Sequence, residues 1–285
     1  VEAFHDSTNS KQLLDYPGVD LPGGVLAAGG DATAELNAAL DNIFEHPNVG
    51  PFIARRLIQR LVTSNPSAAY IQRVASAFNN NGSGVRGDLK AVLRAILLDS
   101  EARYGPWQYP SIFGKLREPL LKNTQLWRAM EARTETGRVE TLSPYPGIED
   151  WYGQGPLRSP SVFNFFQPDY RQSGEISELG LFSPEFQILT DSNIVSTNNR
   201  LFSLSFCFYS EGESCWTNGH GAVMKLNTLR DASLADSNPG GLLDRYSLLF
   251  MSGQMSPFMR QTLLDRLNTL EAEPENPLSR QRIQH

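Results

Sequence analysis

Two histidines near the start of the chain are the residues best suited to chemistry. His5 stands beside Asp6, and His46 follows a segment whose apolar spacing predicts a helix. An imidazole, a carboxylate and a guanidinium are groups that acid–base or metal-assisted hydrolysis uses. The candidate catalytic residues are therefore His5, Asp6, His46 and Arg56, provided that the fold brings them together. The alternative is structural, since a histidine at a helix end interacts favourably with the helix dipole.

A second candidate site is a loop rich in asparagine and glycine. Asn79, Asn81 and Ser83 stand at alternate positions before Gly84, which is the order found in helix–loop–helix calcium sites, and Asp88 follows. Lys90 occupies the place where such a site needs a glutamate. The loop is therefore a turn-forming cluster by default, with a calcium site as the alternative, and we expect no other cofactor. Gly82, Gly84 and Gly87 also match the GxGxxG motif of dinucleotide-binding sites. That motif requires a preceding strand, whereas a helix is predicted before this loop.

Aromatic residues are frequent in the middle of the chain. In the sequence they are either packing anchors or a surface for a sugar or peptide ligand. The candidate ligand-binding residues are Trp151, Tyr152, Phe163, Phe165, Phe166 and Tyr170.

Cysteine usage bears on the compartment. Cys207 and Cys215 flank a short polar stretch centred on Gly212. A disulfide between them is geometrically plausible and would fit an oxidising compartment. The alternative is two unpaired thiols.

The composition limits the function classes. The chain has 285 residues and a formal net charge of −6, which disfavours a nucleic-acid surface. No apolar run reaches the roughly 18–20 residues that a membrane helix needs, so we expect no span in this chain. Neither end reads as a natural terminus, and a leader is expected to lie outside the chain.

The elements that must position these residues are mostly helices. Apolar residues recur at helical spacing in three segments, around Leu36 to Phe44, Val49 to Leu61 and Leu89 to Leu97, the last opened by Asp88 as N-cap. Further helices are predicted at cap–proline pairs. These pairs are Asn65-Pro66, Ser183-Pro184, Asn238-Pro239 and Ser256-Pro257, and a longer helix is expected from near Glu118-Pro119 past Trp127 to about Arg133.

The predicted fold is mainly α, a multi-helix array with a small β-hairpin and long ordered loops. The hairpin is expected within residues 4–26. A soft boundary near Gly105 would divide residues 1–104, the hairpin with a helical cluster, from residues 105–285, a helical domain with long aromatic-rich loops. The two parts would also be compatible with one continuous domain.

Three strings carry a family resemblance. They are HPNVGPFIARRLIQRLVTSNPS from His46, FGKLREP from Phe113 and PSVFNFFQPDY from Pro160. In this order they resemble the C-terminal portion of the bacterial family called domain of unknown function 1800. The first segment, Phe4 to Leu14, and the tail from Leu242 to Leu270 look like that family as well.

The resemblance implies context rather than chemistry, because no reaction comes with it. Members of the family tend to be exported, and they are often encoded beside a sulfatase-like family, domain of unknown function 1501. We therefore expect an exported protein, periplasmic, cell-surface or extracellular, that acts without catalysis in a complex with such a partner. The alternatives are a hydrolase for an envelope or extracellular polymer and a carbohydrate-binding module.

Overall fold

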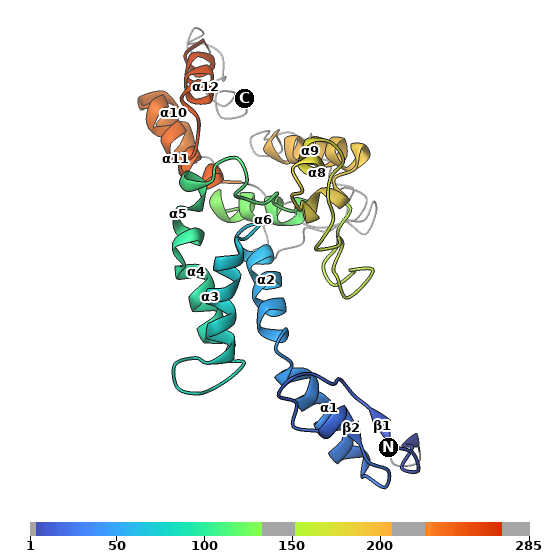
Figure 1. The fold of residues 1–285 in the computed structure, drawn as a ribbon. Helices are drawn as coiled ribbons and strands as arrows, with labels where there is room; N and C mark the ends of the chain where they lie inside the picture. Colours follow the sequence, from blue (N-terminus) through green and yellow to red (C-terminus); the bar gives the residue numbers. More distant parts are fainter. Residues whose placement is uncertain (1–3, 133–151, 207–225, 228, 270–285) are drawn as a thin grey trace. The chain divides into compact units, whose positions relative to one another are not determined.

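A computed structural model describes residues 4–132, 152–206, 226–227 and 229–269. The chain forms two compact units. Unit 1 contains residues 1–116 and 168–184, and unit 2 contains residues 117–167 and 185–285. The predicted boundary near Gly105 falls inside a helix of unit 1. Gly105 also packs directly against the ring of Phe113, which belongs to the same unit. The described elements are mainly α-helical, as predicted (Figure 1).

Unit 1 begins with a two-stranded antiparallel hairpin and a helix. Strand β1 spans Lys11–Gln12 and β2 spans Val25–Leu26, with the short 3-10 helix η2 (Pro22–Gly24) between them. Helix α1 covers Ala32–Glu45 and is capped by the Asp31 side chain. The predicted hairpin is present but very short.

The core of unit 1 lies between α2 (Val49–Leu61), α3 (Ala68–Asn79) and α4 (Leu89–Leu98), which pack on one another (Figure 1). Its centre is built from Ala54, Ile58, Tyr70, Val74, Ala75, Phe78, Val92 and Ile96. The Tyr70 hydroxyl donates to the Ile96 carbonyl at 2.7 Å, so the one polar atom at the centre is paired. Burial raises the pKa of Tyr70, which keeps the phenol neutral.

Helix α1 differs from the core helices, because it buries polar side chains and exposes apolar ones. Glu35 and Asn42 are buried, whereas Leu36, Leu40, Ile43 and Phe44 are exposed. The Asn42 amide explains this orientation, because it accepts from the Leu14 N–H at 3.1 Å and donates to the Leu14 carbonyl at 2.9 Å. The hairpin segment therefore covers the polar face of α1 and leaves the apolar face outside.

Arg86 connects the end of α1 to the loop between α3 and α4. Its guanidinium donates to the Phe44 carbonyl at 3.0 and 3.1 Å and to the His46 carbonyl at 3.2 Å. It also lies 5.1 Å from the centre of the Phe78 ring. A Cβ on Gly87 would collide with Phe44, so that ring rests directly on the loop backbone.

Two more elements belong to unit 1. Helix α5 (Ser100–Gln108) follows α4, and α8 (Glu175–Glu178) lies in the segment that returns at residues 168–184. Asp99 caps α5 and also accepts two bonds from Arg73, at 2.7 and 2.8 Å. The sequence did not predict α5, since Gly105 and Pro106 lie inside it.

Two predicted caps are wrong. Helix α3 begins at Ala68 with Ser67 as its N-cap, because the Asn65 side chain bonds to the backbone of Phe182 instead. After Ser183 the chain forms only a 3-10 helix, η3 (Pro184–Ile188), and the Ser183 hydroxyl accepts from the Gln172 N–H.

Unit 2 contains α6 (Pro119–Ala129), α9 (Asp191–Phe206), α10 (Leu229–Ser237), α11 (Pro239–Met251) and α12 (Pro257–Thr269). Helix α11 packs on both α10 and α12 (Figure 1). Asn238 and Ser256 accept bonds from the first turns of α11 and α12, which confirms these two caps. Asp231 is buried and pairs with Arg245 at 2.8 Å, which joins α10 to α11.

Candidate functional site

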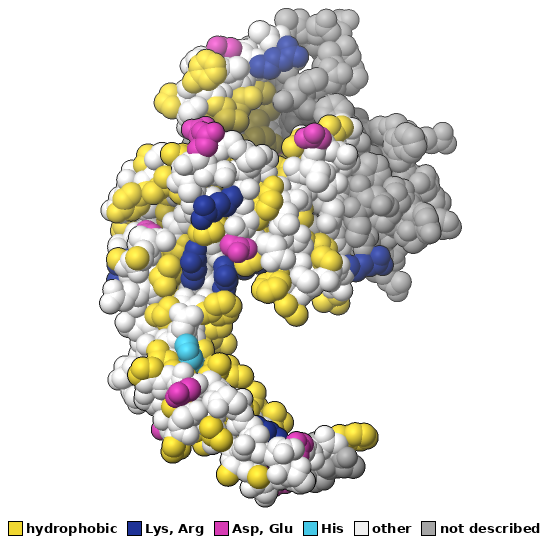
Figure 2. All heavy atoms as spheres, turned by 45° about the vertical axis from the view of Figure 1, so that its right-hand side comes forward, with side chains coloured by type: hydrophobic (Ala, Val, Ile, Leu, Met, Phe, Trp, Pro, Cys, Tyr) yellow, Lys and Arg dark blue, Asp and Glu magenta, His cyan; other side chains and the backbone are white. Residues whose placement is uncertain are grey.

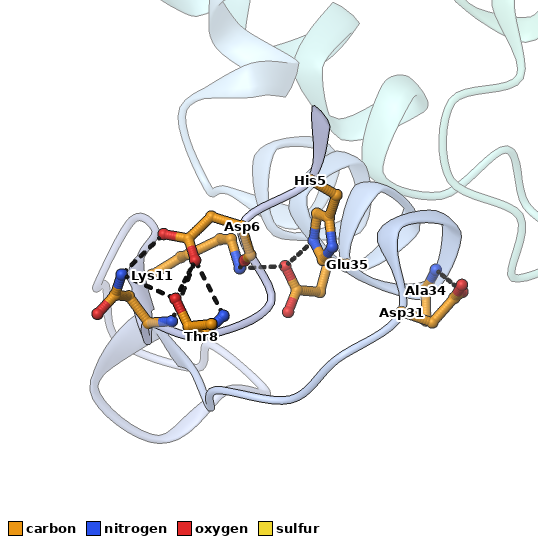
Figure 3. Close-up of polar contacts among 8 residues, drawn as sticks. His5, Asp6, Thr8, Lys11, Asp31, Ala34 and Glu35 are labelled. Carbon is orange, nitrogen blue, oxygen red and sulfur yellow. Dashed lines mark hydrogen bonds and ion pairs between the residues drawn. The ribbon is translucent and has the colours of Figure 1, made fainter. Parts of the chain in front are cut away.

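The described residue set holds one polar cluster that contains two of the candidate catalytic residues (Figure 3). His5 and Asp6 lie just before β1, and Lys11 begins that strand. Glu35, from the first turn of α1, is buried between them. One oxygen of Glu35 accepts from His5 Nε2 at 2.8 Å and from Lys11 Nζ at 2.6 Å. Glu35 is thus the shared acceptor at the centre of the cluster.

Two local features hold this carboxylate in place. Glu35 lies in the turn that Asp31 caps, so the start of α1 fixes its backbone. A Cβ on Gly30 would collide with the Glu35 carboxylate, which means that the glycine backbone packs directly against it. The cluster therefore depends on a glycine that the sequence alone does not single out.

The electrostatics keep Glu35 ionised. The hydrogen bond from Lys11, followed by that from His5, lowers the pKa of Glu35, although burial opposes the shift. An ionised Glu35 can orient the His5 ring but cannot serve as a proton donor at neutral pH. The arrangement is suited to positioning an imidazole and to joining three segments.

The Asp6 carboxylate stabilises the turn that follows it. Its carboxylate accepts from the backbone and hydroxyl of Thr8, at 2.9 and 2.7 Å, and from the Asn9 side chain at 2.9 Å. Hydrogen bonds from Asn9 and then Thr8 hold the pKa of Asp6 far below its usual range. Lys11 Nζ donates to the Asp6 carbonyl at 2.5 Å, so the turn and the cluster are joined.

The other two candidate catalytic residues have different partners. His46 lies edge-on to the Tyr16 ring, with the ring centres 4.7 Å apart, and its Nδ1 accepts from the Asn48 N–H at 3.1 Å. Arg56 donates to Gln59 at 3.0 Å and stacks on Phe52. The described ranges contain no group of three His, Cys, Asp or Glu residues that could hold a metal ion.

In the loop proposed as a calcium site, side-chain oxygens already accept hydrogen bonds from groups of the same loop. Asn81 Oδ1 accepts from the N–H groups of Ser83 and Val85, while its amide donates to Asp88 at 2.8 Å. Asp88 also caps α4, as predicted, by accepting from Lys90 and Ala91. The Asn79 side chain accepts from Arg86. A cation would compete with these donors for the same oxygens, and calcium binding stays a prediction.

The candidate ligand-binding aromatics differ in exposure. Tyr152 and Phe166 are buried, Phe165 and Tyr170 are half-buried, and Phe163 is exposed. Tyr170 belongs to unit 1 and the others to unit 2. Trp151 lies outside the described residues, as do Cys207 and Cys215, so the ligand surface and the disulfide stay predictions.

Sequence reasoning missed Glu35 and Lys11. The signal that could have found Glu35 is its spacing of seven from Asn42, which places two polar residues on the face of α1 away from the apolar stripe. Lys11 offered no such signal, because its role depends on how the hairpin lies on α1.

Comparisons with known proteins bear on the family and leave the chemistry open. Among the described residues, no helix is both long and apolar enough to cross a membrane. No curated protein and no solved structure matches the chain. A family model described as "Protein of unknown function (DUF1800)" matches residues 3–281, which is nearly the whole chain. The resemblance seen in the three sequence strings is therefore confirmed, and the chain belongs to the DUF1800 family.

Proposed function

We propose that this protein is an exported, non-enzymatic component of the bacterial envelope or cell surface that acts by binding a partner protein. The observation that carries the proposal is the apolar face of α1. Leu36, Leu40, Ile43 and Phe44 are 58, 56, 55 and 40 % exposed. Their spacing places them on one side of the helix, and we call these four residues the α1 stripe.

The α1 stripe is exposed because the fold uses the opposite face of the helix for the hairpin. Glu35 and Asn42 fasten that face through hydrogen bonds to His5, Lys11 and Leu14. Contiguous exposed apolar surface marks sites of protein interaction, and α4 exposes a second such row, Leu89, Leu93 and Leu97. The α1 stripe is therefore a surface prepared for another polypeptide.

The partner that we propose is a sulfatase-like protein of the family called domain of unknown function 1501. Its identity and the exported location rest on the context that the family resemblance implies. The chemistry required of the partner follows from the stripe, which needs an apolar ridge or groove of matching length. Burial of exposed Leu, Ile and Phe side chains would supply about 25 cal/mol per Å² of apolar area.

The polar candidates support a non-enzymatic function. The Glu35 carboxylate accepts a hydrogen bond from His5. The Asp6 carboxylate accepts hydrogen bonds from Thr8 and Asn9, and the His46 ring packs on Tyr16. Each of these side chains thus has a structural partner within its own segment or the next. A binding protein requires only that such contacts fix the orientation of α1.

The test is reconstitution of the purified chain with a DUF1501 protein from the same organism. We expect a complex in size-exclusion chromatography with light scattering, and we expect Leu36→Ser/Leu40→Ser/Ile43→Ser to weaken it at least tenfold. Leu89→Ser/Leu97→Ser is the matched control, because both leucines are exposed on α4. Absence of a complex with the wild-type chain, or equal weakening by both variants, would contradict the proposal.

A hydrolase is the second candidate function, favoured by one observation. His5 Nε2 lies 2.8 Å from Glu35, which is the geometry of an imidazole oriented by a carboxylate. A hydrolase would lose turnover of an envelope polymer in His5→Gln while its thermal stability changed little. A binding protein would show no polymer turnover in either form.

A further inference from the structure

Arg55 and Arg171 of unit 1 both lie on the ring of Phe182, and Arg56 follows Arg55 on α2. Arg55 and Arg56 come from α2, and Arg171 comes from the returning segment 168–184. Within the described residues, no carboxylate lies within the 4.0 Å that defines an ion pair from any of the three guanidinium groups. Arg73 and Arg245, by contrast, pair with Asp99 and Asp231.

Phe182 holds two of these arginines in position. The Arg55 guanidinium lies 4.9 Å from the centre of the Phe182 ring, and that of Arg171 lies 4.6 Å from it. Stacking of a guanidinium on a ring fixes its plane while leaving its N–H donors at the edge. Two cations are thereby placed around one aromatic residue.

The backbone of Phe182 is itself fixed. The Asn65 side chain accepts from the Phe182 N–H at 2.8 Å and donates to the Phe182 carbonyl at 2.9 Å. Gln59 Nε2 reaches the Pro168 carbonyl at 3.3 Å, which fastens the start of the same segment to α2. The arginine cluster is thus pre-organised rather than assembled from mobile side chains.

The cluster carries one buried donor without an acceptor and excess positive charge. The Nε atom of Arg55 is buried and has no hydrogen-bond partner among the described residues. Burial lowers the pKa of Arg56, and the positive charge of Arg55 lowers it further, whereas Asp169 raises it. Asp169 is exposed and makes no ion pair, so it offsets only part of the charge. Figure 2 shows several Lys and Arg side chains near the middle of the view, with hydrophobic and acidic side chains among them.

We propose that Arg55, Arg56 and Arg171 form a binding site for an oxyanion, with Phe182 as the platform that orients it. The planar fork of arginine matches carboxylate, sulfate and phosphate oxygens, and charge-assisted bonds to such groups are the stronger kind. The oxyanion supplies the acceptor that the buried N–H of Arg55 lacks. This site is separate from the α1 stripe and does not depend on the proposed partner.

The experiment is isothermal titration of the full chain at low ionic strength with two probes, inorganic sulfate and a hexaglutamate peptide. Binding of sulfate identifies a small oxyanion as sufficient, and binding of hexaglutamate alone identifies carboxylates carried on a peptide. Either result supports the site if Arg55→Gln/Arg171→Gln weakens binding about tenfold or more, the effect expected when charge-assisted bonds are removed.

Arg94→Gln is the control for a remote charge, because Arg94 is exposed on α4; it removes one positive charge, as Arg56→Gln does, whereas Arg55→Gln/Arg171→Gln removes two. We expect its affinity to stay within about twofold of wild type, since a remote exposed charge acts weakly. Equal weakening by Arg94→Gln, unchanged binding in the double variant, or no binding of either probe would overturn the proposal.

Folding of the variants is monitored by circular dichroism. If Arg55→Gln/Arg171→Gln loses its helical signal, Arg56→Gln decides in its place, because Arg56 does not stack on Phe182. We expect about fivefold to tenfold weaker binding in Arg56→Gln and partial recovery in Arg56→Lys, which keeps the charge but loses the fork. Wild-type affinity in Arg56→Gln would then contradict the site.

Discussion

The α2–α3–α4 core and the α1–hairpin region are neighbours in unit 1 but are held together differently. The core buries Ile58, Val74 and Ile96 completely, and its apolar faces meet each other. The α1–hairpin region buries Glu35 and Asn42 and keeps its apolar stripe outside. Helical periodicity is similar in both, so periodicity alone predicts a helix but does not decide which face is buried.

The comparison indicates that a helix attached through hydrogen bonds can keep its apolar face available for contact with another molecule. A helix held by hydrophobic burial uses part of its apolar side for its own fold, as α4 does with Val92 and Ile96 while Leu89 and Leu97 stay exposed. A helix held by hydrogen bonds to a hairpin can present that side to a partner. The following variants separate these two modes of attachment.

The largest expected effect is in the core. Ile58→Ala should lower the free energy of unfolding of unit 1 by about 2–5 kcal/mol, because it removes fully buried methyl groups and leaves a cavity. Urea unfolding followed by circular dichroism measures this loss. A loss below about 1 kcal/mol would mean that the α2–α3–α4 core is not the stabilising element described here.

The polar fastening of α1 should contribute less. Asn42→Ala removes both bonds to Leu14 and should destabilise the hairpin locally by about 1–3 kcal/mol. Hydrogen exchange at the Leu14 amide measures the change. Asn37→Ala, an exposed position of the same helix, is the control and should leave that exchange rate unchanged.

The Glu35 contact should make the hairpin sensitive to acid. Because the pKa of Glu35 is lowered from 4.5, its contribution is fully present above pH 4.5 and is lost as the pH falls through the lower folded value. An NMR titration of the Lys11 and Glu35 signals should show the hairpin loosening only in that acidic range. Glu35→Gln should remove this step and Asp41→Asn should keep it, so a step that persists in Glu35→Gln would rule out this origin.

The smallest effect on stability is expected at the α1 stripe. Leu40→Asn should change the free energy of unfolding by no more than about 0.5 kcal/mol, because the side chain is already exposed. A loss of 2 kcal/mol or more would show that the stripe is buried within the protein in solution. That outcome would also remove the basis for partner binding through α1.

Sequence reasoning predicted the elements that depend on local chemistry. The apolar periodicity of α1, α2 and α4, the Asp88 cap and the Asn238-Pro239 and Ser256-Pro257 starts all follow from contacts within a few residues. It failed at Asn65 and Ser183, which follow the same cap–proline pattern but whose side chains bond elsewhere. A cap is predictable only while no distant backbone group competes for it.

The candidate sites were harder to predict for the same reason. His5 and Asp6 could be named from their residue types, but their partners depend on how the hairpin lies on α1. The role of Arg171 and Phe182 requires the return of a segment more than a hundred residues later. Long-range pairing of this kind leaves no periodic trace in the sequence.

The return of residues 168–184 to unit 1 has a consequence for synthesis on the ribosome. Asn65 and Phe182 are 117 residues apart, and at roughly 5–20 residues per second the ribosome needs about 6–23 s to bridge that interval. A nascent chain therefore has its α2–α3–α4 sequence available well before the Phe182 platform exists. The arginine cluster is the last part of unit 1 to be completed, and a fragment that stops at Leu116 would never acquire it.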